Sequence, residues 1–123
     1  MILVDTSVWI DHLRGHESPL ADYLSQAIVA THPFIIGELA LGNLSRRDEL
    51  LLLLGNLPHV PTVTTSEVLD FIGKNRLFGL GIGYIDAHLL AATRLAHGCR
   101  LLTRDKRLAN VVIRLGIAQL SAH

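Results

Sequence analysis

The chain has 123 residues, 50% of them hydrophobic, and its 11 basic and 11 acidic side chains give a formal net charge of zero. A chain of this length and composition buries one core, so we expect a single domain over residues 1–123. The neutral balance excludes the strongly basic composition of a general nucleic-acid binder, and any phosphate-rich substrate must be held by local groups.

The first elements alternate strand and helix. Residues 1–4 form a short apolar run that predicts a strand. Asp5, Thr6 and Ser7 follow, and because all three residue types cap helices, a helix is expected next. A second helix is expected after Pro19, and it leads into a second strand over residues 28–30.

The middle of the chain predicts two more helices and a short strand. Pro33 suits the first turn of a helix that carries Glu38 beside an apolar stripe. Ser45 is expected to cap the next helix, whose five leucines at 50–54 place apolar side chains on every face. Such a helix must be covered on more than one side. Residues 58–61 are bounded by prolines and predict a short edge strand.

The second half of the chain continues the alternation. Thr65 or Ser66 is expected to cap a helix that ends before the glycines at 79, 81 and 83, and the next helix should run from about Tyr84 to His97. A clear interior strand is expected over residues 99–103.

The last predicted elements are a helix and a short strand. Asp105 is expected to cap a helix over residues 106–115, and a final strand is expected over residues 117–120. Strands that alternate with helices imply a mostly parallel sheet with helices on both faces. The predicted fold class is therefore α/β.

Four acidic residues fall where this arrangement would bring them together: Asp5, Glu38, Asp86 and Asp105. Asp5 and Asp105 each follow a strand, and ligands of open α/β sheets bind beyond the carboxyl ends of the strands. Converging carboxylates without a cysteine or histidine cluster favour a hard cation such as Mg²⁺ or Mn²⁺. Taken singly, each acid also has a simpler explanation as a helix cap, a dipole partner or an exposed side chain.

Such a cluster suits cleavage of phosphate esters. Phosphodiester hydrolysis needs an activated water, neutralised phosphoryl oxygens and a stabilised leaving oxygen, and one or two Mg²⁺ ions can supply these. Without a cation, the packed carboxylates would repel one another, and some of their pKa values would rise. The sequence therefore favours a metal-dependent enzyme.

The order and spacing of four motifs resemble the PIN-domain ribonucleases, and in particular the short VapC-type toxins of toxin–antitoxin pairs. The motifs cover nearly the whole chain, and they comprise Val4-Asp5-Thr6-Ser7, Glu38-Leu39 with Gly42, Asp86-Ala87 with Leu90, Ala91 and Ala92, and Gly98-Cys99-Arg100-Leu101-Leu102-Thr103-Arg104-Asp105.

The resemblance implies a three-layer α/β/α PIN-like domain in which the four acids hold Mg²⁺ or Mn²⁺ and an attacking water. Ser7 and Thr103 match hydroxyl positions that support those acids. Similar proteins are homodimers that cut RNA, often tRNA or ribosomal RNA at a loop, and a small VapB-type antitoxin inhibits them. Some members carry additional acids in the last motif, where this chain has only Asp105, so the choice between one ion and two stays open.

Arg104 and Arg107 lie on either side of Asp105, and we expect them to contact RNA phosphates. The surplus apolar surface of the leucine helix independently predicts a partner, either an amphipathic antitoxin helix or a second subunit.

Two other classes of function remain open at this point. One is a metal-dependent enzyme on another phosphate ester, namely a DNA nuclease of the same fold or a phosphatase. An aspartyl phosphatase usually has a second aspartate two residues after the first, where this chain has Ser7. The other class is a non-catalytic dimeric binding module whose acids only cap helices, and its stability would not depend on divalent metal.

Cys99 is the single cysteine, so an internal disulfide is excluded, which suits a reducing cytoplasm. No basic segment followed by a long apolar stretch opens the sequence, so no secretory signal is expected. The longest apolar run is the five leucines, whereas a membrane-spanning helix needs about 20 residues. We therefore expect a cytoplasmic protein without a membrane segment.

Overall fold

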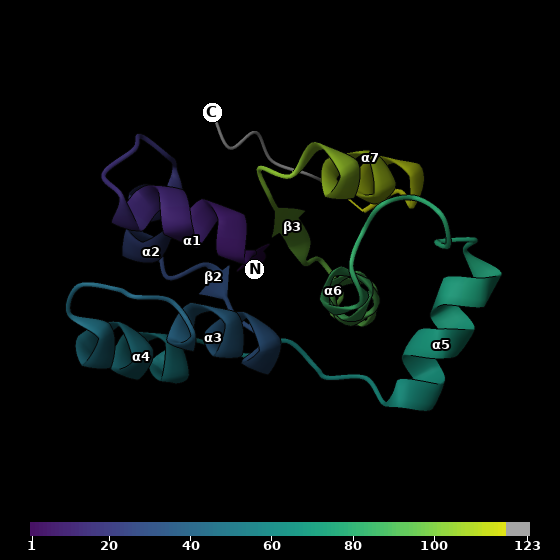
Figure 1. The fold of residues 1–123 in the computed structure, drawn as a ribbon, viewed down its shortest axis with the longest axis horizontal. Helices are drawn as coiled ribbons and strands as arrows, with labels where there is room; N and C mark the ends of the chain where they lie inside the picture. The colour runs from purple at the N-terminus through teal and green to yellow at the C-terminus, as the bar shows by residue number, and fades with distance from the viewer. Residues whose placement is uncertain (118–123) are drawn as a thin grey trace.

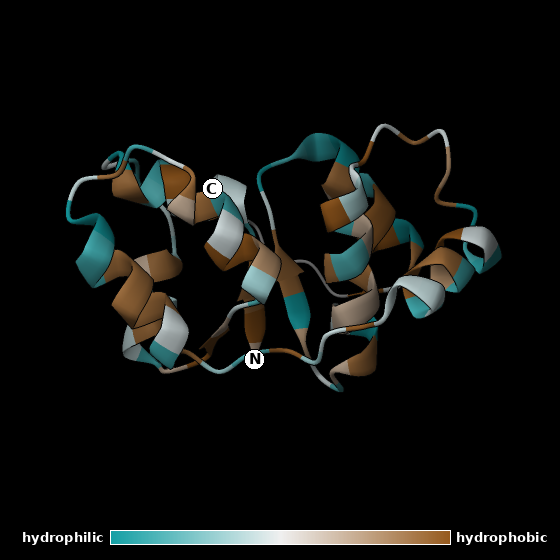
Figure 2. Ribbon diagram, turned by 60° about the horizontal axis from the view of Figure 1, so that its bottom comes forward, coloured by the Kyte–Doolittle hydropathy of each residue, from teal (hydrophilic) through white to brown (hydrophobic). Residues whose placement is uncertain are grey.

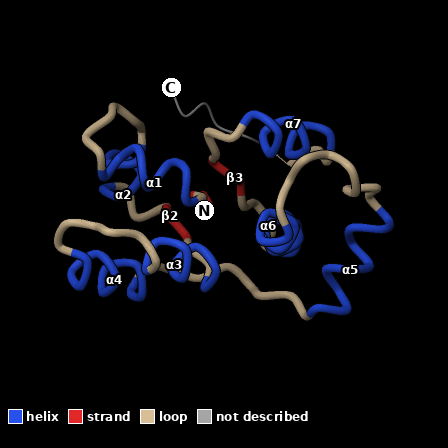
Figure 3. The backbone as a smooth tube through the Cα atoms, viewed as in Figure 1, coloured by secondary structure: helices blue, strands red, loops and turns tan. Residues whose placement is uncertain are grey.

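The computed structural model describes residues 1–117 and is built around a three-stranded parallel sheet. β1 (Ile2–Val4) is the central strand, with β2 (Val29–Ala30) on one side and β3 (Arg100–Leu102) on the other. Figure 3 shows how short these strands are beside the helices. Because β1 and β3 are parallel neighbours, the residues that follow them emerge at the same edge of the sheet.

Helices cover the sheet on both faces. In the view of Figure 1, α1 and α7 lie above the strands, whereas α3 and α6 lie below them. The predicted α/β class, with a parallel sheet between two helical layers, is therefore confirmed. The helices of the described chain are α1 (Thr6–Leu13), α2 (Leu20–Ser25), α3 (Pro33–Ala40), α4 (Arg47–Asn56), α5 (Thr65–Lys74), α6 (Tyr84–Leu95) and α7 (Lys106–Arg114).

The core lies at the sheet and on the helix faces turned toward it. Leu3 is fully buried and pairs with Ala30 of β2 and Leu101 of β3. Trp9 of α1 is also almost fully buried, so it belongs to the core. Figure 2 shows mainly hydrophobic strands at the centre and helices that carry both kinds of residue. Burial of each such side chain stabilises the fold by about 1.5–3 kcal/mol. The buried sheet therefore holds the residues at its edge in defined positions.

The start of α5 differs from the prediction by one position. Thr64 is the N-cap, in place of Thr65 or Ser66, and its side chain accepts a hydrogen bond of 3.1 Å from the backbone N–H of Glu67. The Glu67 carboxylate in turn accepts a bond of 2.9 Å from the Thr64 N–H. The glutamate three residues after Thr64 completes this capping box, and that is why the helix begins there.

The leucine helix α4 also begins differently from the prediction. Ser45 does not cap it, because Arg46 occupies the cap position with a φ of 53° and without a side-chain hydrogen bond. Among residues 1–117, the cover lies on one side of the helix, where leucines 50 and 54 are buried. Leu52 and Leu53 are 68% and 44% exposed, so the expected cover on a second side does not come from the described part of this chain.

The predicted edge strand at residues 58–61 is wrong in extent. Only His59 pairs with the sheet, through a single parallel bridge to Thr31 beyond β2. The Thr31 N–H donates to the Pro58 carbonyl at 2.8 Å, and the Val60 N–H donates to the Thr31 carbonyl at 3.0 Å. The prolines at 58 and 61 lack the N–H that a longer ladder needs.

Several predicted boundaries shift slightly, as is common at helix ends. α6 ends at Leu95, two residues before the predicted end, and α7 ends at Arg114. The final predicted strand is wrong at Ile117, which lies outside any strand, and residues 118–120 lie outside the described residues. A search of the described helices for one that is long and apolar enough to cross a bilayer finds none.

Candidate active site

Asp5 sits at the carboxyl end of β1 and caps α1. Its Oδ1 accepts hydrogen bonds from the Ser7 N–H at 3.0 Å, the Ser7 hydroxyl at 2.5 Å and the Val8 N–H at 3.4 Å. Its Oδ2 accepts a bond of 2.6 Å from the Thr103 hydroxyl. Burial raises the pKa of Asp5 in spite of these bonds, and the nearby Asp86 carboxylate raises it further.

Ser7 and Thr103 join the ends of β1 and β3. Besides donating to Asp5, the Ser7 hydroxyl accepts a bond of 3.0 Å from the Arg104 N–H. The Thr103 hydroxyl likewise accepts a bond of 3.0 Å from the Asp105 N–H. The two hydroxyl groups therefore hold the Asp5 side chain and the backbone before α7 in a fixed relation.

Asp105 caps α7 at the neighbouring position on the sheet edge. Its Oδ1 accepts bonds from the Arg107 N–H at 2.8 Å and the Leu108 N–H at 3.2 Å. The side chain is exposed, and its Oδ2 has no hydrogen bond within residues 1–117. One oxygen of Asp105 thus serves the helix, and the other can take a ligand.

Asp86 lies in the first turn of α6, where its Oδ2 accepts a bond of 3.1 Å from the Gly83 N–H. Burial raises the pKa of Asp86, and repulsion from Asp105 and Glu38 adds to the rise. The backbone bond from Gly83 acts in the opposite direction. Asp86 thus interacts electrostatically with each of the other three acids.

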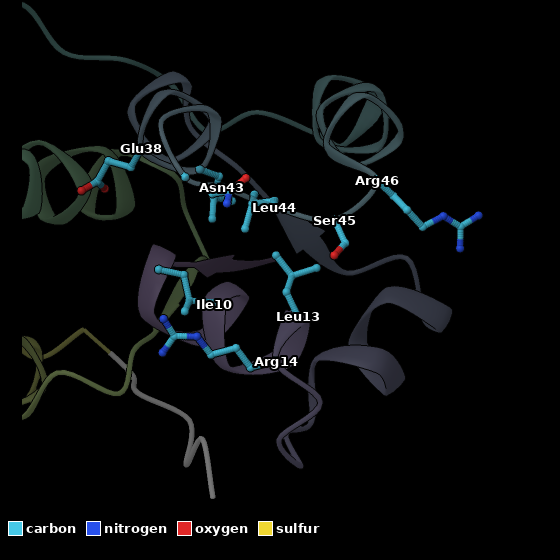
Figure 4. A pocket seen from close by; sticks show the side chains of 10 residues that line it. Ile10, Leu13, Arg14, Glu38, Asn43, Leu44, Ser45 and Arg46 are labelled. Atoms are coloured by element: carbon cyan, nitrogen blue, oxygen red, sulfur yellow. The ribbon is translucent and has the colours of Figure 1, made fainter.

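Glu38 projects from the middle of α3. Its Oε1 accepts a bond of 2.9 Å from the Thr6 hydroxyl at the start of α1. Glu38 also lines one end of a cavity of about 620 Å³ between α1 and the α3–α4 connection. In Figure 4 its side chain points away from Ser45 and Arg46, which line the other end. The cavity does not include the other three acids, so it adjoins the cluster and does not contain it.

The four acids therefore lie near one another, but their carboxylates are not arranged as the ligands of a metal ion. Within residues 1–117, no group of three or more aspartate, glutamate, histidine or cysteine side chains is arranged to hold a metal ion. The donors are all carboxylate oxygens, the ligands that Mg²⁺ and Mn²⁺ prefer, and a bound cation would oppose the rise in the pKa values of Asp5 and Asp86 that burial and neighbouring acids cause. The residues present thus fit a divalent cation.

The two arginines singled out from the sequence differ in their surroundings. The guanidinium Nε of Arg104 lies 2.5 Å from Oδ2 of Asp11 on α1, so that side chain is already paired within the protein. Arg107 lies against the glycine connection before α6. A Cβ at Gly81, where φ is +79°, would come within 2.9 Å of the Arg107 side chain. Arg107 is exposed and forms no ion pair in the described structure.

Three contacts of the site were missed by the sequence interpretation: those of Thr6 with Glu38, Asp11 with Arg104 and Gly83 with Asp86. Thr6 and Asp11 each contact a residue that is distant in the sequence, and only the tertiary structure brings these partners near. The Gly83 contact had a local signal, because an acid three residues after a cap position forms a capping box.

Comparison with known proteins agrees with this architecture. The model of the PIN domain family matches residues 2–113. Ribonuclease VapC32 from two strains of Mycobacterium tuberculosis, CDC 1551 / Oshkosh and ATCC 25618 / H37Rv, is 49% identical over 118 residues, which cover 96% of this chain and 95% of the relative.

A solved structure shows the same fold at much lower sequence identity. PAE2754 from Pyrobaculum aerophilum superimposes with a TM-score of 0.61 and 16% identity, covering 94% of each chain. This likeness supports the fold alone, whereas the family match spans most of the sequence. The chain therefore belongs to the PIN domain family and is a homologue of VapC-type ribonucleases.

Proposed function

We propose that this protein is a divalent-metal-dependent endoribonuclease that acts as the toxin of a toxin–antitoxin pair. The observation that carries the proposal is the position of Asp86 near the other acids, since burial and the charges of Asp105 and Glu38 raise its pKa, and Asp86 in turn raises the pKa of Asp5. The 49% identity to proteins named Ribonuclease VapC32 supports RNA as the substrate.

The four carboxylates would hold Mg²⁺ or Mn²⁺. When bound, the cation neutralises phosphoryl oxygens and activates a water for attack on the phosphodiester. Asp5 is fixed by Ser7 and Thr103, so its position changes least. Asp86 and Asp105 each use one oxygen to accept from backbone N–H groups, which leaves the other oxygen for the cation.

Glu38 has a second role in this proposal, besides helping to hold the cation. It is exposed, and only its Oε1 is held, by Thr6. An exposed carboxylate on a helix can orient a water and accept its proton. With Asp105 as the only acid of the last motif, we favour one tightly held ion.

Two macromolecular partners follow from the proposed toxin role. The substrate is an unpaired loop of a structured RNA such as tRNA or ribosomal RNA, since sequence-specific proteins read unpaired bases. Arg107 is the better placed of the two arginines to contact its phosphates, because Asp11 already pairs with Arg104. We propose a VapB-type antitoxin and a second copy of the chain as the protein partners.

RNA cleavage by the purified, antitoxin-free protein tests this function. Incubated with total cellular RNA and Mn²⁺ or Mg²⁺, the protein should produce discrete new ends, and EDTA should abolish them. Asp86→Asn should lower the rate at least about 100-fold, because a metal ion contributes several kcal/mol to such reactions. Asp70→Asn is the matched control, since Asp70 pairs with Lys74 on the surface of α5.

The same assay separates the alternatives. Metal-dependent cleavage of DNA without cleavage of RNA would replace the ribonuclease with a DNA nuclease. Undiminished RNA cleavage by Asp86→Asn would contradict the assigned site.

A further inference from the structure

Four aromatic rings form a connected row at the N-terminal ends of α3 and α6, which we call the aromatic row. It comprises His32, Phe34, His88 and Tyr84 in spatial order. The ring centroids are 5.0 Å apart between His32 and Phe34, 4.9 Å between Phe34 and His88, and 4.7 Å between His88 and Tyr84. The row thus bridges two helices.

The row has buried members and exposed members. His32 is 1% and His88 5% exposed, whereas Phe34 is 39% and Tyr84 49% exposed. The rings of Phe34 and Tyr84 lie at 76° and 86° to the ring of His88, so the buried histidine supports both by edge contacts. Two aromatic rings are therefore held in place while part of each surface stays open to a ligand.

The exposed rings lie beside the acids. Phe34 and Glu38 are four residues apart on α3, a spacing that places both on one face of the helix. Tyr84 and Asp86 share the first turn of α6. The contact between Phe34 and His88 brings these two helix segments together. Phe34 therefore places one end of the exposed part of the row beside Glu38, and its contact with His88 connects Tyr84 to it.

The charge of the protein makes such a surface useful to a ribonuclease. The formal net charge is zero, and Arg104, next to Asp105 in the sequence, is already paired with Asp11. Of the two arginines near Asp105, this leaves Arg107 for a phosphate contact. Stacking on an aromatic side chain contributes to RNA binding without positive charge, and rings that are already fixed lose little freedom when a base stacks.

We infer that Phe34 and Tyr84 form a stacking platform for an unpaired nucleobase of the RNA substrate. The base would lie next to the phosphate that is cleaved at the acids, so this inference rests on the proposed ribonuclease function. The platform positions the RNA strand and takes no part in the chemistry. It favours unpaired RNA, because a paired base has no open face.

RNA binding without cleavage tests the platform directly. The probe is a fluorescent single-stranded RNA of about ten nucleotides, titrated with protein in Ca²⁺ and followed by anisotropy, beside the same oligonucleotide made of abasic residues. Tyr84→Leu and Phe34→Leu should each weaken binding of the normal RNA about 5- to 100-fold, the range that loss of one stacked base gives. Tyr84→Phe should retain the affinity.

Two controls make the result specific. Phe78→Leu should bind as the wild type does, because Phe78 is 67% exposed but lies in the α5–α6 connection, outside the aromatic row. The abasic RNA should bind the wild type and Tyr84→Leu equally weakly, since neither pair can stack. Thermal melting of each variant checks that the fold is kept.

These binding and cleavage measurements distinguish an error in the stacking platform from an error in the proposed function. If the wild type neither binds nor cuts RNA, the proposed function falls and the platform with it. If the wild type cuts RNA and Tyr84→Leu binds normal RNA equally well, only the platform is wrong. A loss of dimer mass in sedimentation with unchanged RNA affinity would likewise overturn the platform and assign the row to a subunit contact.

Discussion

Asp5 and Asp86 are two carboxylates of the site whose surroundings raise their pKa values. Asp5 is buried and accepts bonds from Ser7, Thr103 and Val8, yet burial still raises its pKa. Asp86 has one backbone bond, and its pKa rises through burial and through repulsion from other acids. Both carboxylates thus reduce the stability of the metal-free fold when they are charged.

Replacing Asp86 by asparagine should stabilise the metal-free protein at neutral pH. A folded-state pKa above the unfolded value of 3.8 means that the folded state binds the proton more tightly, so stability falls as pH rises above 3.8. In EDTA at pH 7, Asp86→Asn should therefore melt higher than the wild type. Below about pH 3.8 the carboxyl is protonated in both states, and the difference should vanish. A variant that melts lower at pH 7 would contradict the repulsion.

At the residue scale, local chemistry was readable from the sequence and tertiary contacts were not. The caps made by Asp5 and Asp105 were predictable, because each follows a strand and precedes a helix. The bond from Thr6 to Glu38 joins residues 32 positions apart, and no local pattern encodes it.

Among the elements, α3 is capped by a histidine, whose protonation would remove the acceptor of the cap. The Nδ1 of His32 accepts a bond of 3.0 Å from the Phe34 N–H, and the buried Nε2 has no partner in the described residues. Burial, with repulsion from His88 and His59, lowers the pKa of His32 to about 4. The neutral imidazole is therefore the form that starts α3, the helix that carries Glu38.

The His32 cap predicts a loss of stability in mild acid. The unfolded state takes up the proton near pH 6.5 and the folded state only near pH 4, so stability is complete above 6.5 and falls toward 4. Between pH 7.5 and 4.5 the free energy of unfolding should drop by about 2–3 kcal/mol through this residue. Urea denaturation at both pH values measures it.

His32→Asn is the matched variant for this effect. Asparagine keeps an acceptor for the Phe34 N–H but does not titrate. Its stability should change less between the two pH values, whatever its absolute stability. An equal drop in wild type and variant would show that His32 is not the responsible group.

At the element scale, patterns with a local cause were predicted well. The break after Val4 and the proline at the start of α3 mark real boundaries, whereas the strand predicted over 99–103 is one residue shorter at each end as β3. The edge strand at 58–61 was overestimated, because its pairing depends on a neighbour, Thr31, that is distant in sequence. The cap of α5 was misplaced by one residue because Thr64, Thr65 and Ser66 are all good caps, and Glu67 selects Thr64.

For the molecule as a whole, the alternation of strands and helices was sufficient to predict a parallel sheet with helices on both faces. It did not predict where α5 would lie, and Figure 1 shows α5 at one end of the molecule, away from the sheet. α5 packs on α6, and its place depends on the glycine-containing connection between them. The topology predicted that Asp5 and Asp105 would lie at neighbouring strand ends, whereas the positions of Glu38 and Asp86 depend on how α3 and α6 pack.

The exposed leucines of α4 predict a partner surface of the whole molecule. Leu54 is fully buried, so a charge there would damage the core. Leu52→Glu with Leu53→Glu should instead leave the melting temperature within a few degrees of the wild type, because both side chains are exposed. The double variant should lose binding to the antitoxin, measured by co-purification. Leu69→Glu on α5, where Leu69 is 56% exposed, should retain it.

That assignment has a clear contrary result. If the double variant keeps both antitoxin binding and its oligomeric state in sedimentation, α4 is not a partner surface.

The central claim is that the four carboxylates form one divalent-cation site, and Mn²⁺-dependent melting tests it most directly. A ligand that binds only the folded state raises the melting temperature, by an amount that grows with its concentration. The account predicts a rise for the wild type and for the surface control Asp70→Asn, and little or no rise for Asp86→Asn. No rise in the wild type, or the same rise in all three proteins, would contradict the metal site.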